Sequence, residues 1–489
     1  MSPKTHLDIL NYRISTHGGR PFYKLLHRDA NGSLTWTDVT YSEFGRDIDA
    51  VSRHFKSTMG SAGVPNGAVV GMQRVLYGLS YSDIVHMYAL CKAGYIPDMI
   101  TTSLTNAEVV LEMLRESNAK AFLHAPGLGL PKTSEIPTFT PVPVSDFQNL
   151  QGEFDFSPAP TYNAEDLAFI QHTSGSTTRP KTVLCTNKWF QSVYNSWTSV
   201  WNPVDEDEPQ DVFSLPGSVC QPSGFHALCV GIHLGGAFIE TSATPGNPLF
   251  PADELVQLAV KGGLNRLNTF APLMIPHIMG AQAQFEAGED TVLRVLQKMR
   301  SIVYGGMPML PVFEDWGFEN KLPLMNTLGT TETGEDLAKC SDNEEQLFAL
   351  VVLPTSVNIP QRASCDESGK FYTGDLFSQN ENGTYSHRGR NGDWIKVGNA
   401  YLIDTKTIEE HIKTTCSDLI KEHVIVGTNR PAIALLAEAT HPDCGDEGKH
   451  TIIQRMTAFH ERRMPWERLV WSNILFVPRG TLPRTVRQV

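Results

Sequence analysis

The sequence has few of the features that mark secreted, metal-stabilised or membrane-spanning chains. Its eight cysteines are scattered over 489 residues. None belongs to a CxxC pair, so neither a zinc site nor a disulfide framework is indicated. No window approaches about eighteen uninterrupted apolar residues, and the segment from Met1 to His6 has no apolar run typical of a signal peptide. We therefore expect a cytoplasmic protein that is neither secreted by an ordinary signal nor membrane-spanning.

Positive charge is also scarce. The formal net charge is −13 and the sequence pI is near 5.7. This balance disfavours nucleic acids and anionic membranes as partners, because both require clustered lysine and arginine. The acidic run at residues 205–208 lies next to prolines, which favours a solvated loop over a metal site. An anionic ligand must then be held by a local group of residues.

The remaining composition is that of a soluble globular protein, with 41% hydrophobic and 19% charged residues. The length suggests two to four domains or subdomains. Short β-like runs alternate with amphipathic helices, and a capping-box pattern at Thr40 and Glu43 opens a helix that ends near Gly60. Further strands are expected over residues 68–72 and 120–124, and further helices over 81–92 and 105–117. The alternation predicts parallel, doubly wound α/β layers.

Two other regions depart from this alternation. Residues 126–160 are rich in proline, serine and threonine and are expected to form a long surface connection. The last hundred residues read as a smaller α+β unit. Its expected elements are a helix over 405–415, a hairpin of strands over 424–427 and 432–436, a helix over 452–464 and a strand over 473–477.

The stretch from His172 to Lys181, HTSGSTTRPK, is the most informative part of the chain. Residues 173–178 offer five hydroxyls and a glycine, and two basic residues follow, so the segment is suited to surrounding a polyphosphate. A Walker loop has similar spacing, but Pro180 stands where that motif needs its second glycine. The β-branched residues that follow predict a strand, whereas a Walker loop opens a helix. A surface turn without a ligand is the alternative.

At this point the chain resembles the AMP-forming adenylating enzymes, which include acyl-CoA synthetases, luciferases and the adenylation domains of nonribosomal peptide synthetases. Their phosphate loop reads [ST]SG[ST]TGxPK, and residues 173–181 match it with Thr178 in place of the usual glycine. Five further segments are similar in order and spacing. They are GFHAL at 224–228, GGMP at 305–308, NTLGTTE at 326–332, FYTGD at 371–375 and GRNGDWIK at 389–396.

The resemblance implies a role for each matching residue. The implied nucleotide-binding residues are Thr173, Ser174, Gly175, Ser176, Thr177, Thr178, Lys181, His226, Gly305, Gly306, Asn326, Thr327, Thr331, Asp375, Arg390, Asn391, Gly392 and Asp393. The implied catalytic residues are Lys181, His226, Thr331, Glu332 and Lys396, with Glu332 as the ligand of Mg²⁺. Phe225, His226, Ala227 and Gly305 are implied to line the acid pocket.

Elementary chemistry is consistent with these roles. Each segment alone could also be explained by structure without a ligand. A carboxylate such as Asp375 can accept two hydrogen bonds from a vicinal diol, and Glu332 can hold a hard cation that bridges polyphosphate. Gly305 and Gly306 permit close backbone approach to a planar base. The alternatives are a core histidine at His226 and a polar turn around residue 332. The family match favours the functional readings.

The resemblance also implies a division into domains. Residues 1–390 are expected to form a large domain of doubly wound sheets, and residues 391–489 a small, mobile α+β lid that swings about Gly392. The family usually has aspartate at this hinge position. The final segment LPRTVRQV is similar to the approach to the family's last motif, whose lysine bridges the carboxylate and the α-phosphate. No lysine follows, so we expect either truncation or partial replacement by Arg487.

The implied reaction joins a carboxylate to Mg·ATP and gives acyl-AMP and pyrophosphate. Domains that take α-amino acids carry an aspartate just after the aromatic position of the acid wall, and residues 225–227 offer none. An unpaired ammonium group is costly to bury, so we expect an aryl or polyketide-like acid.

The segments at 389–396 and 483–485 are similar to adenylation domains of fungal synthetase-like carboxylic acid reductases. That similarity implies a phosphopantetheine thiol of a carrier domain as the acyl acceptor and an NADPH-dependent reductase domain downstream. Neither is present, since no GxGxxG opens a βαβ unit, and the fragment is expected to be a monomer. The alternatives are a free-standing acyl-CoA ligase and a catalytically silent nucleotide-binding module.

Overall fold

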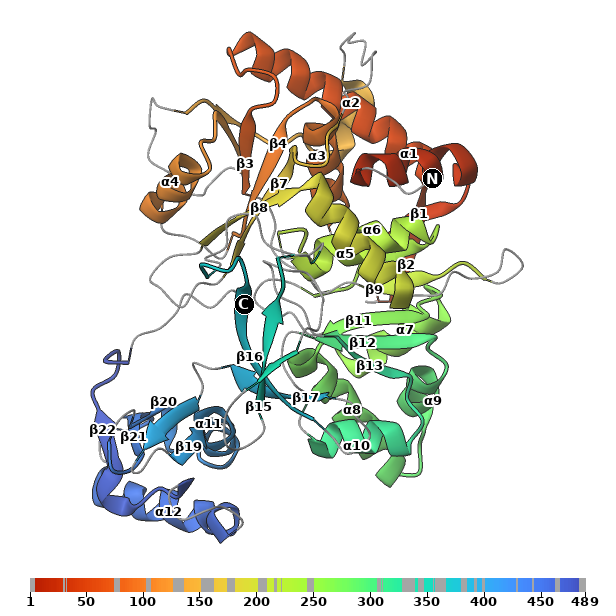
Figure 1. Ribbon diagram of the computed structural model, residues 1–489. Helices are drawn as coiled ribbons and strands as arrows, with labels where there is room; N and C mark the ends of the chain where they lie inside the picture. Colours follow the sequence, from red (N-terminus) through yellow and green to blue (C-terminus); the bar gives the residue numbers. More distant parts are fainter. Residues whose placement is uncertain are drawn as a thin grey trace. The chain divides into compact units, whose positions relative to one another are not determined.

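A computed structural model (Figure 1) describes residues 5–29, 31, 33–73, 80–102, 107–125, 136–150, 162–173, 181–214 except 201–208, 218–220, 222–243, 250–305, 309, 311–327, 339–341, 347–354, 356, 366–379, 385–390, 394–397, 401–427, 430–441, 444–461 and 467–482. The chain divides into two compact units. The larger comprises Met1–Asp336, Thr355–Ser364 and Val486–Val489, and the smaller comprises Leu337–Pro354 and Cys365–Thr485.

The first sheet of the larger unit has six strands. Their order is β6 (Thr138–Phe139), β5 (Ala121–His124), β3 (Val69–Gln73), β4 (Ile96–Ile100), β7 (Leu167–Thr173) and β8 (Lys181–Thr186). All neighbours are parallel except β7 and β8, which form an antiparallel hairpin. The carboxyl ends of β3, β4, β5 and β7 therefore lie at one edge of this sheet.

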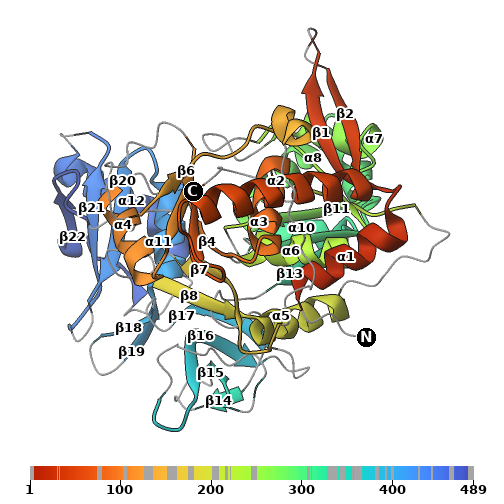
Figure 2. The ribbon, with the colours of Figure 1, turned by 90° about the horizontal axis from the view of Figure 1, so that it is seen from above.

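The second sheet of the larger unit has seven strands. Their order is β13 (Leu324–Thr327), β12 (Ser301–Gly305), β11 (Arg266–Phe270), β9 (Val212–Ser214), β10 (Ala237–Ile239), β1 (Pro21–Arg28) and β2 (Leu34–Thr40). Only β1 and β2 are antiparallel, and they form the long hairpin at one end of the sheet (Figure 2). Parallel strands with intervening helices match the doubly wound α/β class that the sequence predicts.

Helices cover these sheets in layers. Those of the large unit are α1 (His6–His17), α2 (Tyr41–Ser61), α3 (Tyr81–Lys92), α4 (Ala107–Glu116), α5 (Asn187–Val200), α6 (Pro222–His233), α7 (Ala252–Val260), α8 (Ala271–Glu286), α9 (Thr291–Gln297) and α10 (Pro311–Glu319). One apolar core joins both sheets with α1, α2, α3, α5 and α6, and includes Met72, Tyr88, Phe213 and Leu228. A second core lies between the seven-stranded sheet and α7 to α10, and a third between the six-stranded sheet and α4.

Local sequence signals explain several element boundaries. The hydroxyl of Thr40 accepts from the backbone N–H of Glu43, and the Glu43 carboxylate accepts from the backbone N–H of Thr40, so α2 begins with the expected capping box. Gly94 ends the turn after α3 with a φ of 82°, a conformation that favours glycine. The expected surface connection over 126–160 is wrong in part, because it contains β6 and a short 3₁₀ helix, Val144–Asn149, that buries Phe147.

The smaller unit contains two sheets and a hairpin. The sheets are β14 (Lys339–Ser341), β15 (Leu347–Val352), β16 (Phe371–Gln379) and β17 (Tyr385–Arg390), and then β20 (Ile420–Val426), β21 (Ala434–Ala439) and β22 (Ile474–Val477). The hairpin is β18 (Trp394–Val397) with β19 (Tyr401–Asp404). Helix α11 (Thr405–Thr415) has the expected bounds, whereas α12 (Gly445–Glu461) begins seven residues before the expected start.

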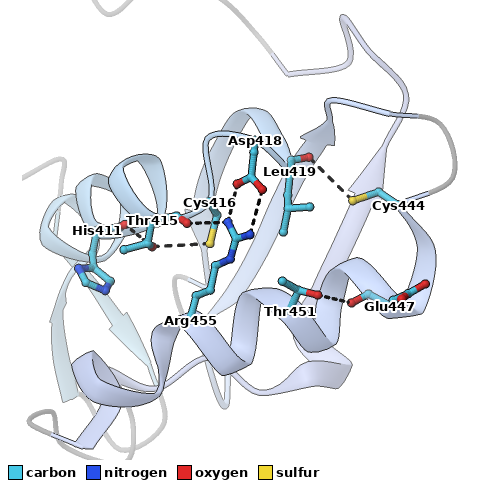
Figure 3. A network of polar contacts seen from close by, with 9 residues as sticks. All are labelled: His411, Thr415, Cys416, Asp418, Leu419, Cys444, Glu447, Thr451 and Arg455. Atoms are coloured by element: carbon cyan, nitrogen blue, oxygen red, sulfur yellow. Dashed lines mark hydrogen bonds and ion pairs between the residues drawn. The ribbon is translucent and has the colours of Figure 1, made fainter.

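Arg455 joins the two helices of the smaller unit (Figure 3). Its guanidinium group contacts both carboxylate oxygens of Asp418, just after α11, and donates to the carbonyl of Thr415 at the end of α11 at 2.8 Å. Because the last carbonyls of a helix lack helical partners, this contact satisfies one of them. The guanidinium group beside Asp418 lowers the pKa of that carboxyl.

The sequence-based boundary at residue 390 lies after β14 to β17, whereas these strands group with the smaller unit. The expected lid over 391–489 and its swing stay predictions. None of the described helices is both long and apolar enough to cross a membrane.

Candidate nucleotide and acid site

The segment expected to bind phosphate begins at the end of β7 and ends at the start of β8. Thr173 is the last residue of β7 and Lys181 the first residue of β8, and the two are register partners. The prediction that a strand follows the hydroxyl-rich segment is thus confirmed, which separates this segment from a Walker loop. Only the backbone of Thr173 and Lys181 is described, so their proposed contacts with phosphate stay predictions.

A second group of expected residues meets at the ends of β12 and β13. Asn326 pairs with Tyr304, and Thr327 pairs with Gly305, so two segments separated by about twenty residues of sequence become neighbours. A Cβ atom added to Gly305 would lie 2.7 Å from Oγ1 and 2.9 Å from the carbonyl oxygen of Thr327. Only glycine fits there without a shift of Thr327, and the proposed contact of Gly305 with a planar base stays a prediction.

The expected acid wall lies in the first half of α6. Phe225, His226 and Ala227 are all buried, and the ring centroids of His226 and Trp189 of α5 lie 4.9 Å apart. Burial lowers the pKa of His226 to about 3, so its imidazole is neutral at pH 7. Neither α5 nor α6 contains an aspartate or glutamate. The wall is therefore aromatic and uncharged.

Strand β7 connects this wall to the phosphate hairpin. The ring of Phe169 lies 4.3 Å from that of Phe225 and 5.8 Å from that of Trp189, measured between centroids. His6 of α1 is buried against Phe169 and Phe225, and burial lowers its pKa to about 4. The strand that ends at Thr173 and the helix that carries His226 thus share one packed aromatic cluster.

In the smaller unit, the structure brings together the two residues expected to contact ribose. Asp375 on β16 and Arg390 on β17 are register partners. Asp375 is buried, and its backbone N–H donates to Oγ1 of Thr373, whose hydroxyl donates to the carbonyl of Leu350. Gly374 between them has a φ of 83°, which explains the glycine of this segment. The Arg390 side chain is outside the described atoms.

Of the remaining expected residues, Lys396 lies on β18 opposite Leu402, and only its backbone is described. The residues outside the described ranges are Ser174, Gly175, Ser176, Thr177, Thr178, Gly306, Thr331, Glu332, Asn391, Gly392 and Asp393. Within those ranges no group of three or more His, Cys, Asp or Glu side chains is arranged to hold a metal. The magnesium role of Glu332 stays a prediction.

Sequence reasoning missed the residues that support this site. Trp189 and Phe169 form the surroundings of the acid wall, and Asp98 contacts His172 immediately before the hydroxyl-rich segment. The two aromatic residues lie outside every motif segment that the sequence analysis identified. The contact of Asp98 with His172 spans 74 positions and has no local signal.

Parallel sheets covered by helices define the class of this fold as α/β. A family model described as AMP-binding enzyme matches residues 15–350. The chain belongs to the AMP-binding enzyme family and is an AMP-forming ligase.

One relative is similar along its whole length. The AMP-binding domain-containing enzyme iboA of Amanita muscaria (strain Koide BX008) is 31% identical over 525 residues, covering 98% of each chain.

Two solved structures share the fold. O-succinylbenzoate Coenzyme A synthetase (MenE) from Bacillus subtilis, in complex with AMP, has a TM-score of 0.72 at 15% identity and covers 98% of this chain and 95% of its own. The A-PCP didomain of carboxylic acid reductase from Segniliparus rugosus, in complex with AMP, has a TM-score of 0.70 at 14% identity, covering 99% of this chain and 78% of that one. Both confirm a large N-terminal domain followed by a smaller one.

Proposed function

We propose that the protein activates an aryl or polyketide-like carboxylic acid with Mg·ATP and passes the acyl group to a phosphopantetheine thiol of a carrier domain. The observation that carries the acid class is the neutral aromatic wall around His226. An α-ammonium group placed there would lose its hydration and meet no carboxylate from α5 or α6. An aromatic ring would instead pack against Trp189 and Phe225.

The chemistry is a displacement at phosphorus. One carboxylate oxygen of the acid bonds to the α-phosphorus of ATP, the bond from that phosphorus to the bridging oxygen breaks, and pyrophosphate leaves with that electron pair. Positioning and charge neutralisation therefore supply most of the catalysis. The hydroxyls of residues 173–178 and Lys181 would hold the phosphates. Asp375 and Arg390 would hold ribose, and Gly305 would lie against the base.

Two further groups complete the proposal. Mg²⁺ would be held by Glu332 and would supply a hard positive charge for the polyphosphate. Thr331 would contact the α-phosphate, and Lys396 would enter the site for transfer of the acyl group to the thiol. The thioester would then be consumed by an NADPH-dependent reductase domain.

A free-standing acyl-CoA ligase is the second candidate. The fold that the chain shares with a solved Coenzyme A synthetase supports this candidate. A silent nucleotide-binding module is the third, because Thr178 and Gly392 replace residues that the family usually has.

Acid-dependent exchange of labelled pyrophosphate into ATP tests the acid class. We expect exchange with 3-phenylpropanoate and little with L-phenylalanine, which differs from it only by the α-ammonium group. Strong exchange with L-phenylalanine and none with the aryl acids would contradict the proposal. Consumption of free CoA with the accepted acid would identify the ligase alternative, and absence of exchange with aryl, fatty and amino acids would identify the silent module.

A further inference from the structure

The β7–β8 hairpin lies beside β4, with one register pair described between β7 and β4. Strand β7 pairs with β8 from Leu167 to Thr173, whereas its described ladder with β4 is the single pair Asp98 and Ile170. Thr173 and Lys181 are the last register pair before the segment that connects β7 to β8. The position of this pair depends on side chains as well as on backbone hydrogen bonds.

One buried side-chain pair holds β7 against β4. Nε2 of His172 lies 2.5 Å from Oδ1 of Asp98, and the two side chains are 3% and 0% exposed. Ile170 pairs with Asp98, and His172 is two residues further along β7, so the three side chains share one face of the sheet. Among the described residues, Nδ1 of His172 and Oδ2 of Asp98 have no hydrogen-bond partner. In the described part of the chain, each of these two side chains thus forms its hydrogen bond with the other.

The opposite face of β7 is fixed by different means. Phe169 points to the helix layer, where it packs against Phe225 of the acid wall and against Trp189 of α5. Apolar packing is non-directional and leaves a strand some freedom to slide, whereas a short hydrogen bond to a carboxylate sets both distance and angle. The histidine contact lies one residue before Thr173, where the expected phosphate contacts begin.

We propose that His172 and Asp98 are positioning residues for ATP, which set the placement of Thr173 and Lys181 on the β7–β8 hairpin. This inference rests on the proposed phosphate-binding function of the segment 173–181. Because Asp98 accepts from Nε2–H, the pair also fixes the histidine tautomer. The acid wall belongs to α6 and packs on Phe169 from the other face of β7, so disturbance of the pair should affect ATP more than the acid.

The main test replaces both partners with apolar groups, Asp98→Leu with His172→Phe. Removing both polar groups avoids an uncompensated buried charge, so the double variant should keep its fold. We expect Mg·ATP to bind about tenfold more weakly by calorimetry, a change that corresponds to about 1.4 kcal/mol of binding free energy. The KM for ATP in pyrophosphate exchange should rise by the same factor, with a smaller rise in the KM for the acid.

A conservative pair of single variants provides a second test that does not depend on the double variant folding. His172→Gln keeps an amide donor with the reach to contact Asp98, whereas His172→Asn is too short. The glutamine variant should bind ATP nearly as well as the wild type, and the asparagine variant about tenfold more weakly. Equal ATP affinity in the two variants would overturn the inference.

His277→Phe is the matched control, since His277 is an equally buried histidine on α8 that packs on Phe250. It should change the melting temperature without changing ATP affinity. A loss of ATP affinity equal to that of the double variant would show general loosening and overturn the inference, as would wild-type ATP affinity in a folded double variant. Failure of the wild-type enzyme to bind ATP would instead refute the proposed function.

Discussion

Gly305 and Thr327 are register partners at the carboxyl ends of β12 and β13, and Thr327 occupies the space that a side chain at position 305 would need. The hydroxyl of Thr327 also donates to the carbonyl of Tyr304 at 3.4 Å. Thr327 thus fills the space beside residue 305, so only glycine fits at that position without a shift of the strand ends.

Gly305→Ala should therefore impair both folding and ATP binding. The added Cβ would meet a backbone oxygen of Thr327 at 2.9 Å, so the strand ends must shift. Overpacking of this kind costs about 1–3 kcal/mol, measurable by urea unfolding, and the shift should weaken ATP binding in calorimetry. Gly60→Ala on α2 is the matched control, since nothing lies within 4 Å of its added Cβ. A Gly305→Ala enzyme with unchanged stability and ATP affinity would contradict this assignment.

The uncharged acid wall predicts how specificity can be changed. Ala227→Asp would place a carboxylate next to His226, where related domains that take amino acids hold the ammonium group. We expect the ratio of exchange with L-phenylalanine to exchange with 3-phenylpropanoate to rise about tenfold or more, because a paired ammonium group costs far less to bury. Ala227→Asn has nearly the same shape without the charge and should leave the ratio near that of the wild type. Equal ratios in both variants would argue that position 227 lies outside the acid pocket.

Three buried histidines predict a stability that depends on pH. Burial lowers the pKa to about 4 for His6, about 3 for His226 and about 4 for His277. The unfolded chain then binds more protons than the folded one between about pH 4 and 6.5, so stability should fall as pH decreases through this window. Urea unfolding at pH 7.5 and pH 5.0 measures the difference.

His277→Phe removes the contribution of one histidine to the pH dependence of stability. At pH 5.0 a histidine with a folded pKa of about 4 lowers the free energy of unfolding by about 2 kcal/mol relative to neutral pH. The variant should therefore show a pH-dependent loss smaller by about that amount. An identical loss in wild type and variant would mean that His277 titrates normally.

Much of the fold follows from local signals in the sequence. The capping box at Thr40 and the glycine at position 94 mark helix ends by chemistry that acts over a few residues. The bounds of α12 were less predictable because its first turns are polar, and apolar periodicity becomes visible only from Ile452. The buried Phe147 of the 126–160 segment was hidden by its polar, proline-rich surroundings.

The sequence motifs predicted the residues of the candidate site but not the contacts that surround them. The motifs identified Gly305 with Thr327 and Asp375 with Arg390 as functional, and strand register brings each pair together. The contact of His172 with Asp98 could not be predicted from the sequence, because it depends on which strands become neighbours in the sheet. The aromatic surroundings of His226 depend likewise on how α5 and α6 pack.

The central claim is that the chain forms acyl-AMP at a phosphate site that includes Lys181 and Glu332. The most direct measurement is acid-dependent pyrophosphate exchange in the wild type, Lys181→Ala and Glu332→Gln, with Lys188→Ala as control. Lys188 is half exposed and pairs with Glu165 at 3.4 Å on the surface, so its loss should not matter. We expect wild-type exchange with an aryl acid, unchanged exchange in the control and a loss of about 10²-fold or more in the other two variants. Near-normal exchange in Lys181→Ala and Glu332→Gln would contradict the account.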